Sequence, residues 1–123
     1  MDWKIELVPI PVTDVDRAKA FYVDQVGFVA DHDHRVAEGL RFVQLTPPGS
    51  ACSVVLGEGI TEMEPGSQKL LQVVVDDAAA ARDQLRAAGV DASDVDEQPW
   101  GLFVTFADPD GNTWNLQQVV PQG

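Results

Sequence analysis

The sequence runs twice through one order of predicted secondary structure, and this repeat restricts the possible folds more than any other feature. Four residues of the first half match four of the second at one constant offset: Val12, Thr13, Asp14 and Ala18 against Val75, Asp76, Asp77 and Ala81. Each half predicts the order β-α-β-β-β, which indicates two copies of one structural unit. One helix covers only one face of a four-stranded sheet, so the other face must enclose something or pair with the sister sheet. The sequence therefore predicts an α+β protein with a cleft.

The spacing of apolar residues gives the boundaries of the predicted elements. In the first half these are a strand over 4–12, a helix over 15–26, and strands over 28–33, 40–46 and 51–56. In the second half they are a strand over 70–75, a helix over 78–88, a short strand over 90–95 and a hairpin over 103–119. Pro9 and Pro11 cannot donate to a ladder, so the first strand is expected at a sheet edge or at a seam between sheets. We divide the single domain, 1–123, into module 1 at about 4–57, a linker at about 58–68 and module 2 at about 69–120.

A tight turn, Asp-Pro-Asp-Gly-Asn at 108–112, connects the two strands of the C-terminal hairpin. Pro109 fixes φ at the first corner, and Gly111 tolerates a positive φ. Because side chains alternate along a strand, Trp114 is expected to face the helices and the core. Asn115 and Gln117 are expected on the opposite face for the same reason.

Acidic residues outnumber basic ones by 20 to 8, which gives a formal net charge of −12. This charge opposes binding to nucleic acid or to an anionic membrane surface. The sequence has no stretch of roughly 18 apolar residues that could span a membrane and no signal-peptide pattern, so we expect a cytoplasmic protein. Cys52 is the only cysteine of the sequence, which excludes an internal disulfide and a cysteine-rich metal site.

Four segments carry a resemblance to a known superfamily: VTDVDRAKAFYVDQVGF, TPPGSACSVVLGE, VVVDDAAAARDQL and WGLFVTFADPDGNTWNL. They resemble the vicinal oxygen chelate superfamily, which includes glyoxalase I, extradiol dioxygenases, and the fosfomycin- and bleomycin-resistance proteins. The similarity extends from Ile5 to Gln118. It implies two tandem βαβββ modules that form a cupped mixed sheet of glyoxalase-like type, commonly within a homodimer.

In metal-dependent members of this superfamily, four inward-facing positions supply His, Glu or similar ligands. The resemblance places these positions at Leu7, at or next to Val55, at Leu70 and at Asn115. Three hydrocarbon side chains and one neutral amide cannot hold a divalent cation in competition with water. We therefore expect neither a metal nor another cofactor in the cup.

Further side chains are candidates for the cup lining. Gln72 and Gln117 each lie two residues from one of the superfamily's ligand positions and therefore on the same strand face. Trp100 lies in a Pro-Trp-Gly loop, which the resemblance places near the mouth of the cup. There it could stack on a planar ligand, although ordinary core packing is the alternative.

A second candidate is the polar segment Asp31-His32-Asp33-His34. His32 and His34 share one face of a predicted strand, and both aspartates are expected on the opposite face. An imidazole titrates near neutral pH, so either histidine could contact a ligand or transfer a proton. A solvated strand end is the alternative interpretation.

We predict a glyoxalase/bleomycin-resistance-like protein that binds a small aromatic or cationic molecule without a metal. The expected ligand-binding residues are Leu7, Val55, Leu70, Gln72, Trp100, Asn115, Gln117 and His32. Two alternatives stay open. One is a metal-dependent lyase, isomerase or dioxygenase-like enzyme that uses a displaced metal or the two histidines, and the other is a purely structural dimer module. The expected partners are a small-molecule ligand and a second copy of the chain, and the sequence identifies no catalytic residue.

Overall fold

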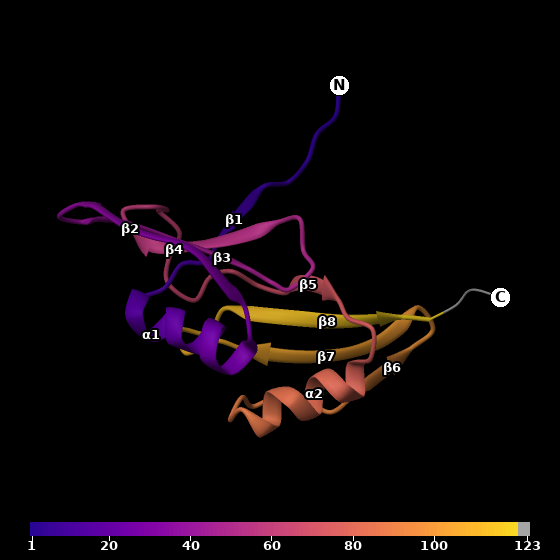
Figure 1. Cartoon of the computed structure of the whole chain (residues 1–123). Coiled ribbons are helices and arrows are strands. Elements are labelled where there is room, and N and C mark those ends of the chain that lie inside the picture. Colours follow the sequence, from indigo (N-terminus) through magenta and orange to yellow (C-terminus); the bar gives the residue numbers. More distant parts are fainter. Residues whose placement is uncertain (121–123) are drawn as a thin grey trace.

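The computed structural model describes residues 1–120, which form two four-stranded mixed sheets and their helices (Figure 1). The first half contains β1 (Leu7–Pro9), α1 (Val15–Ala20), the π-helical turn η1 (Phe21–Val26), β2 (Val29–Ala37), β3 (Leu40–Thr46) and β4 (Ser53–Glu58). The second half contains β5 (Leu71–Val74), α2 (Ala78–Ala87), β6 (Asp96–Gln98), β7 (Gly101–Ala107) and β8 (Thr113–Val119). The strand orders β1-β4-β3-β2 and β5-β8-β7-β6 are equivalent. The predicted α+β class and the repeat of one βαβββ topology are thus confirmed.

Each helix begins at a capping aspartate, and the first helical segment ends at a glycine. Asp14 caps α1 by accepting a hydrogen bond from the backbone N of Arg17 at 3.0 Å, and Asp77 caps α2 by accepting one from Ala80 N at 3.0 Å. Gly27 ends η1 with a φ of 94°, a conformation that favours glycine. None of the helices among residues 1–120 combines the length and apolar character needed to cross a membrane.

One hydrophobic core joins the two modules. The helix-facing sides of both sheets and the apolar faces of the helices contribute to it. At its centre the rings of Tyr22, Phe28 and Trp114 pack with centroid separations of 5.4 to 5.8 Å. Trp114 is only 2% exposed, which confirms its predicted place in the core. Because both helix-facing sides meet in this core, the other face of each sheet, its open face, lies on the outside.

The turn between β7 and β8 is attached to the first module through the buried side chain of Asp108. Its Oδ1 accepts hydrogen bonds from the backbone N of Asp110 and Asn112 at 3.0 and 2.9 Å. Its Oδ2 accepts from Asn112 Nδ2 at 2.8 Å and from the Tyr22 hydroxyl at 2.7 Å. The same hydroxyl accepts from Trp114 Nε1 at 3.0 Å. Burial, and then the Asp108 carboxylate, raise the pKa of Tyr22 well above its usual value, so the phenol keeps the proton that it donates.

We expect Tyr22→Phe to lower the free energy of unfolding by about 1 to 3 kcal/mol, because it leaves the indole N–H of Trp114 buried without an acceptor. Urea unfolding followed by tryptophan fluorescence measures this change. Phe28→Leu, which alters ring packing in the same cluster but no hydrogen bond, is the control for lost aromatic contact. An unchanged free energy of unfolding for Tyr22→Phe would contradict a stabilising role of the network.

An exposed ion-pair cluster holds α1 against β2 and β3. Asp33 accepts hydrogen bonds from Arg41 Nε and Nη2 at 3.0 and 2.8 Å and from Lys19 Nζ at 2.8 Å. The hydrogen bonds from Arg41, followed by the one from Lys19, hold the pKa of Asp33 well below its usual range. Asp33 therefore lies on the helix-facing side of β2.

A lowered pKa in the folded state means that Asp33 stabilises the protein at neutral pH and that this contribution is lost as the pH falls below about 4. We expect Asp33→Asn to lower the free energy of unfolding at neutral pH by about 1 kcal/mol or less, because the cluster is exposed to solvent. The difference from the wild type should shrink in acid. Urea unfolding at a series of pH values tests this. Asp24→Asn, which removes the same charge from an exposed site on η1, should leave the pH dependence unchanged.

Three predicted strands differ from the structure. The strand predicted over 28–33 continues through β2 to Ala37. The first strand is confined to Leu7–Pro9 instead of 4–12, although its position at a sheet edge is confirmed. The strand predicted over 90–95 is wrong, since β6 begins only at Asp96. Within the segment 90–95 the Ala92 carbonyl accepts hydrogen bonds from Arg86 Nε and Nη2 at 3.0 and 2.9 Å. A side chain of α2 thus occupies the acceptor that a ladder would need.

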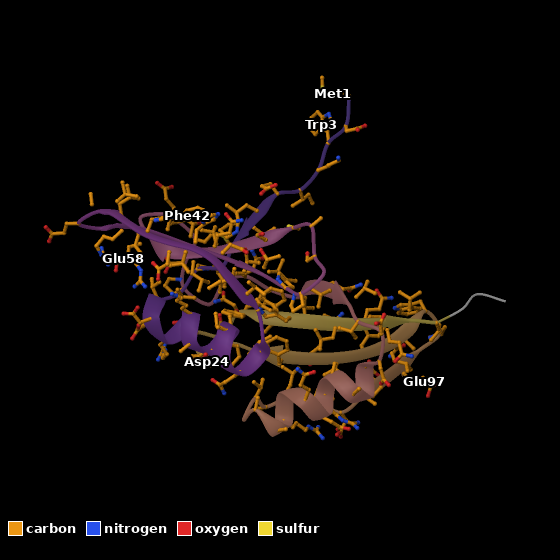
Figure 2. The ribbon with its side chains drawn as sticks, in the orientation of Figure 1. Met1, Trp3, Asp24, Phe42, Glu58 and Glu97 are labelled. Atoms are coloured by element: carbon orange, nitrogen blue, oxygen red, sulfur yellow. The ribbon has the colours of Figure 1, made fainter. Side chains whose placement is uncertain are left out.

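The residues before β1 extend away from both sheets (Figure 1). On this segment Trp3 is 88% exposed and Ile5 is 74% exposed. Figure 2 shows Trp3 beyond the body of the molecule. Burial of large apolar side chains is favourable, so this segment offers contact area that residues 1–120 do not use themselves.

Candidate binding site

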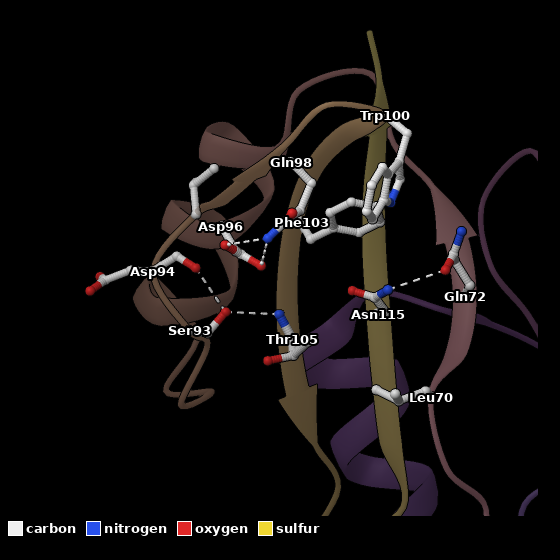
Figure 3. Close-up of a pocket in the computed structure, with 11 residues that line it drawn as sticks. Leu70, Gln72, Ser93, Asp94, Asp96, Gln98, Trp100, Phe103, Thr105 and Asn115 are labelled. Carbon is white, nitrogen blue, oxygen red and sulfur yellow. Dashed lines mark hydrogen bonds between the residues drawn. The ribbon is translucent and has the colours of Figure 1, made fainter.

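The open face of the second sheet contains a wide cavity (Figure 3). Strand pairing places Gln72 of β5 beside Asn115 of β8, and Asn115 beside Thr105 of β7. The cavity has a volume of about 840 Å³ and lies over this sheet and the segment that leads into β6. A space of this size can accept a drug-sized molecule.

Two aromatic side chains form one end of the cavity. Trp100 lies in the turn between β6 and β7 and is 59% exposed, whereas Phe103 of β7 is half-buried. Figure 3 shows both rings at the end of the cavity nearest this turn. They provide an apolar surface on which a planar molecule can stack.

A chain of side-chain amides runs between β8 and β5. Asn115 Nδ2 donates to Gln72 Oε1 at 3.1 Å, and Gln72 Nε2 donates to Gln117 Oε1 at 2.6 Å. Gln117 Nε2 in turn donates to the backbone carbonyl of Trp100 at 3.3 Å. Asn115 Oδ1 is buried and has no hydrogen-bond partner among residues 1–120. A ligand that donates a hydrogen bond can satisfy such an acceptor.

Acidic and neutral polar groups line the side of the cavity formed by β6. Gln98 Nε2 donates to both carboxylate oxygens of Asp96, at 3.2 and 3.1 Å. Asp94 is paired with Arg86 at 3.0 Å, so Asp96 is the carboxylate that remains for a ligand. Within the described chain, the cavity lining includes no Lys, Arg or His. This composition favours neutral or cationic ligands over anionic ones.

The structure brings together only part of the predicted ligand-binding set. Four of the predicted residues line the cavity: Leu70, Gln72, Trp100 and Asn115. Gln117 joins them through its hydrogen bonds. Three others lie on the first sheet: Leu7 and Val55 on paired strands, and His32 on β2. Val55 is buried but lies outside the hydrophobic core, as expected for the open face.

The histidine pair lies on β2. The rings of His32 and His34 are stacked with centroids 5.8 Å apart, and both side chains are exposed. The expectation that both neighbouring aspartates lie on the opposite face is right for Asp33 and wrong for Asp31. An irregularity in the ladder between residues 30 and 32 turns Asp31 to the open face, where Thr46 Oγ1 donates to its carboxylate.

Sequence reasoning missed other residues of the cavity: Ser93, Asp94, Val95, Asp96, Gln98, Phe103 and Thr105. Phe103 and Thr105 alternate with the buried Val104 and Phe106, so the hairpin pattern already contained the signal for their shared face. The segment from 93 to 98 carried no such signal, because its path depends on contacts with α2 and β7.

No group of three or more His, Cys, Asp or Glu side chains among residues 1–120 is placed so that it could hold a metal ion. The four positions that the resemblance gives for metal ligands offer one amide and three hydrocarbon side chains. These residues do not fit a divalent cation.

Comparison with known proteins identifies the family. The model of the Glyoxalase/Bleomycin resistance protein/Dioxygenase superfamily matches residues 4–116. The chain belongs to this superfamily.

Individual relatives extend over nearly the whole chain. The crystal structure of TnmS3, an antibiotic binding protein from Streptomyces sp. CB03234, is 35% identical, covers 97% of this chain and 98% of its own, and superposes with a TM-score of 0.88. A glyoxalase/bleomycin resistance protein from the same organism is 37% identical over 94% of this chain and 100% of its own, with a TM-score of 0.83. The uncharacterized protein YetH of Bacillus subtilis (strain 168) is 27% identical over 119 residues, which are 94% of this chain and 98% of YetH.

We expect protein purified without chelators and without a metal-binding tag to contain substoichiometric zinc, nickel, manganese and iron, because the donor set is too poor. Elemental analysis measures the metal content. A near-stoichiometric metal that is lost in His32→Ala would contradict this expectation and would favour the metal-dependent enzyme.

Proposed function

We propose that this protein binds a planar aromatic small molecule, neutral or cationic, in the cavity on the open face of the second sheet, and that it does so without a metal. The observation that carries the proposal is the combination of an exposed stacking surface with acceptor groups. Trp100 and Phe103 supply the surface, and Asn115 Oδ1 and the Asp96 carboxylate supply the acceptors.

The relatives support a binding role. TnmS3, which is 35% identical over nearly the full length of both chains, is an antibiotic binding protein. We propose an antibiotic-like aromatic compound as the ligand class for this chain as well. Sequestration of such a compound needs no catalytic residue, which agrees with a cavity that holds amides, hydroxyls and carboxylates but lacks a nucleophile paired with a base among the described residues.

We further propose that the protein acts as a homodimer in which a second copy covers the open faces. Both open faces of the described chain carry residues that the superfamily places in one cup, namely Leu7 and Val55 on one sheet and Asn115 on the other. A second copy that presents its first sheet to the cavity would complete the cup. The exposed Trp3 supplies additional apolar area for such a contact.

The role of Trp100 can be tested with planar probes of opposite charge. We expect proflavine, a planar cation, to bind more tightly than anthraquinone-2-sulfonate, a planar anion, because acidic groups line the cavity. Trp100→Ala should weaken proflavine binding by about tenfold through loss of stacking and of the cation–π contact. Fluorescence titration gives the dissociation constants.

Trp100→Phe is the matched control for this experiment, since it keeps an aromatic face at the same turn and should retain most of the affinity. Trp100 is exposed, so neither substitution disturbs the core. Equal affinity of Trp100→Ala and the wild type would show that the ligand binds elsewhere. Failure of the wild type to bind any planar probe below millimolar concentrations would overturn the proposed function.

A further inference from the structure

The chain of amides beside the cavity has a direction. Each donated hydrogen bond points the same way, from Asn115 to Gln72, from Gln72 to Gln117, and from Gln117 to the carbonyl of Trp100. We propose that this chain makes the cavity selective for ligands that present an N–H or O–H donor to Asn115 Oδ1, with Gln72 and Gln117 as positioning residues. The inference rests on the proposed binding function and adds the hydrogen-bonding character of the ligand.

The backbone carbonyl of Trp100, at the end of the amide chain, fixes this direction. A side-chain amide can rotate to exchange its oxygen and its NH₂ group, but a backbone carbonyl can only accept a hydrogen bond. If all three amides reversed, Gln117 Oε1 would face the Trp100 carbonyl oxygen at the distance that now separates donor and acceptor, 3.3 Å. The reversed chain would lose one hydrogen bond and bring two acceptors together. The observed direction is therefore the favourable one.

The fixed direction leaves one acceptor without a donor at the other end of the amide chain, at Asn115. Since Asn115 Nδ2 is held by Gln72, Asn115 Oδ1 is the atom left over, and Figure 3 shows it on the side of the amide away from Gln72, toward β7. This oxygen is buried and has no partner among residues 1–120. A buried acceptor without a donor is costly, so a ligand that supplies the donor gains affinity and a ligand that supplies only an acceptor does not.

The glycine after Trp100 leaves room for the anchoring amide. A Cβ atom added at Gly101 would lie 3.1 Å from Gln117 Nε2 and 3.2 Å from Gln117 Cγ. Both contacts are tighter than ordinary van der Waals separations, so a larger residue would press on the side chain that donates to the Trp100 carbonyl. The turn and the end of the amide chain thus fit each other.

The test compares carbazole with dibenzofuran, two tricyclic compounds of nearly the same shape. Carbazole carries an N–H donor where dibenzofuran carries an ether oxygen. We expect the wild type to bind carbazole about tenfold more tightly, since only carbazole satisfies the buried acceptor. Equilibrium dialysis of the full chain gives both dissociation constants and requires no substitution.

Substitutions then separate the amide chain from other contacts. Gln117→Met removes the anchor without touching the ligand, so Gln72 and Asn115 can reverse and the preference for carbazole should fall toward equality. Asn115→Leu should abolish the preference. Gln84→Met, which removes an exposed side-chain amide of α2 that does not line this cavity, should leave the preference unchanged.

The possible outcomes are distinct. Equal binding of the two compounds by the wild type, or an unchanged preference in Gln117→Met, would overturn the inference. In either case proflavine binding that depends on Trp100 would leave the proposed function standing. Absence of binding by every planar probe would overturn both. Unfolding in urea, measured for each variant, shows whether a lost preference reflects a misfolded protein.

Discussion

The buried carboxylate of Asp108 is the interaction on which the arrangement of the two modules depends. Burying a carboxylate costs free energy unless hydrogen bonds compensate, and here both oxygens have donors. Those donors come from the β7–β8 turn and from Tyr22 of the first module. The Tyr22 hydroxyl also accepts from Trp114, so one network fixes the turn, the helical segment η1 and the central ring of the core.

The shared core also decides what remains available for function. With the helix-facing sides of both sheets turned inward, the open faces are left to meet solvent, a ligand or a second copy of the chain. The open face of the second sheet combines the rings of Trp100 and Phe103 with side-chain amides and the Asp96 carboxylate. A purely apolar face would favour only association, whereas this mixture can also recognise the polar groups of a planar molecule.

Much of the fold could be predicted because it depends on short spacings. The repeat, the two helices and the tight C-terminal turn are local patterns, and the structure agrees with each. The segment over 90–95 could not be predicted, because the side chain of Arg86 takes the Ala92 carbonyl that a strand would have used. The irregularity in β2 beside Asp31 could not be predicted either, because it depends on how β2 pairs with β3.

The candidate site divides in the same way. The sequence by itself determined that Trp114 and Asn115 point to opposite faces of one strand, because side chains alternate wherever a strand forms. It also determined that the four positions matching the superfamily's metal ligands carry too few donor groups for a metal ion, because this depends only on residue type. Only the tertiary structure decided that Leu7 and His32 lie on a different sheet face from Asn115, since two sheets packed on one core turn their open faces outward. Only the tertiary structure joined Gln72, Gln117 and the Trp100 carbonyl into one directed chain, because these contacts connect residues far apart in sequence.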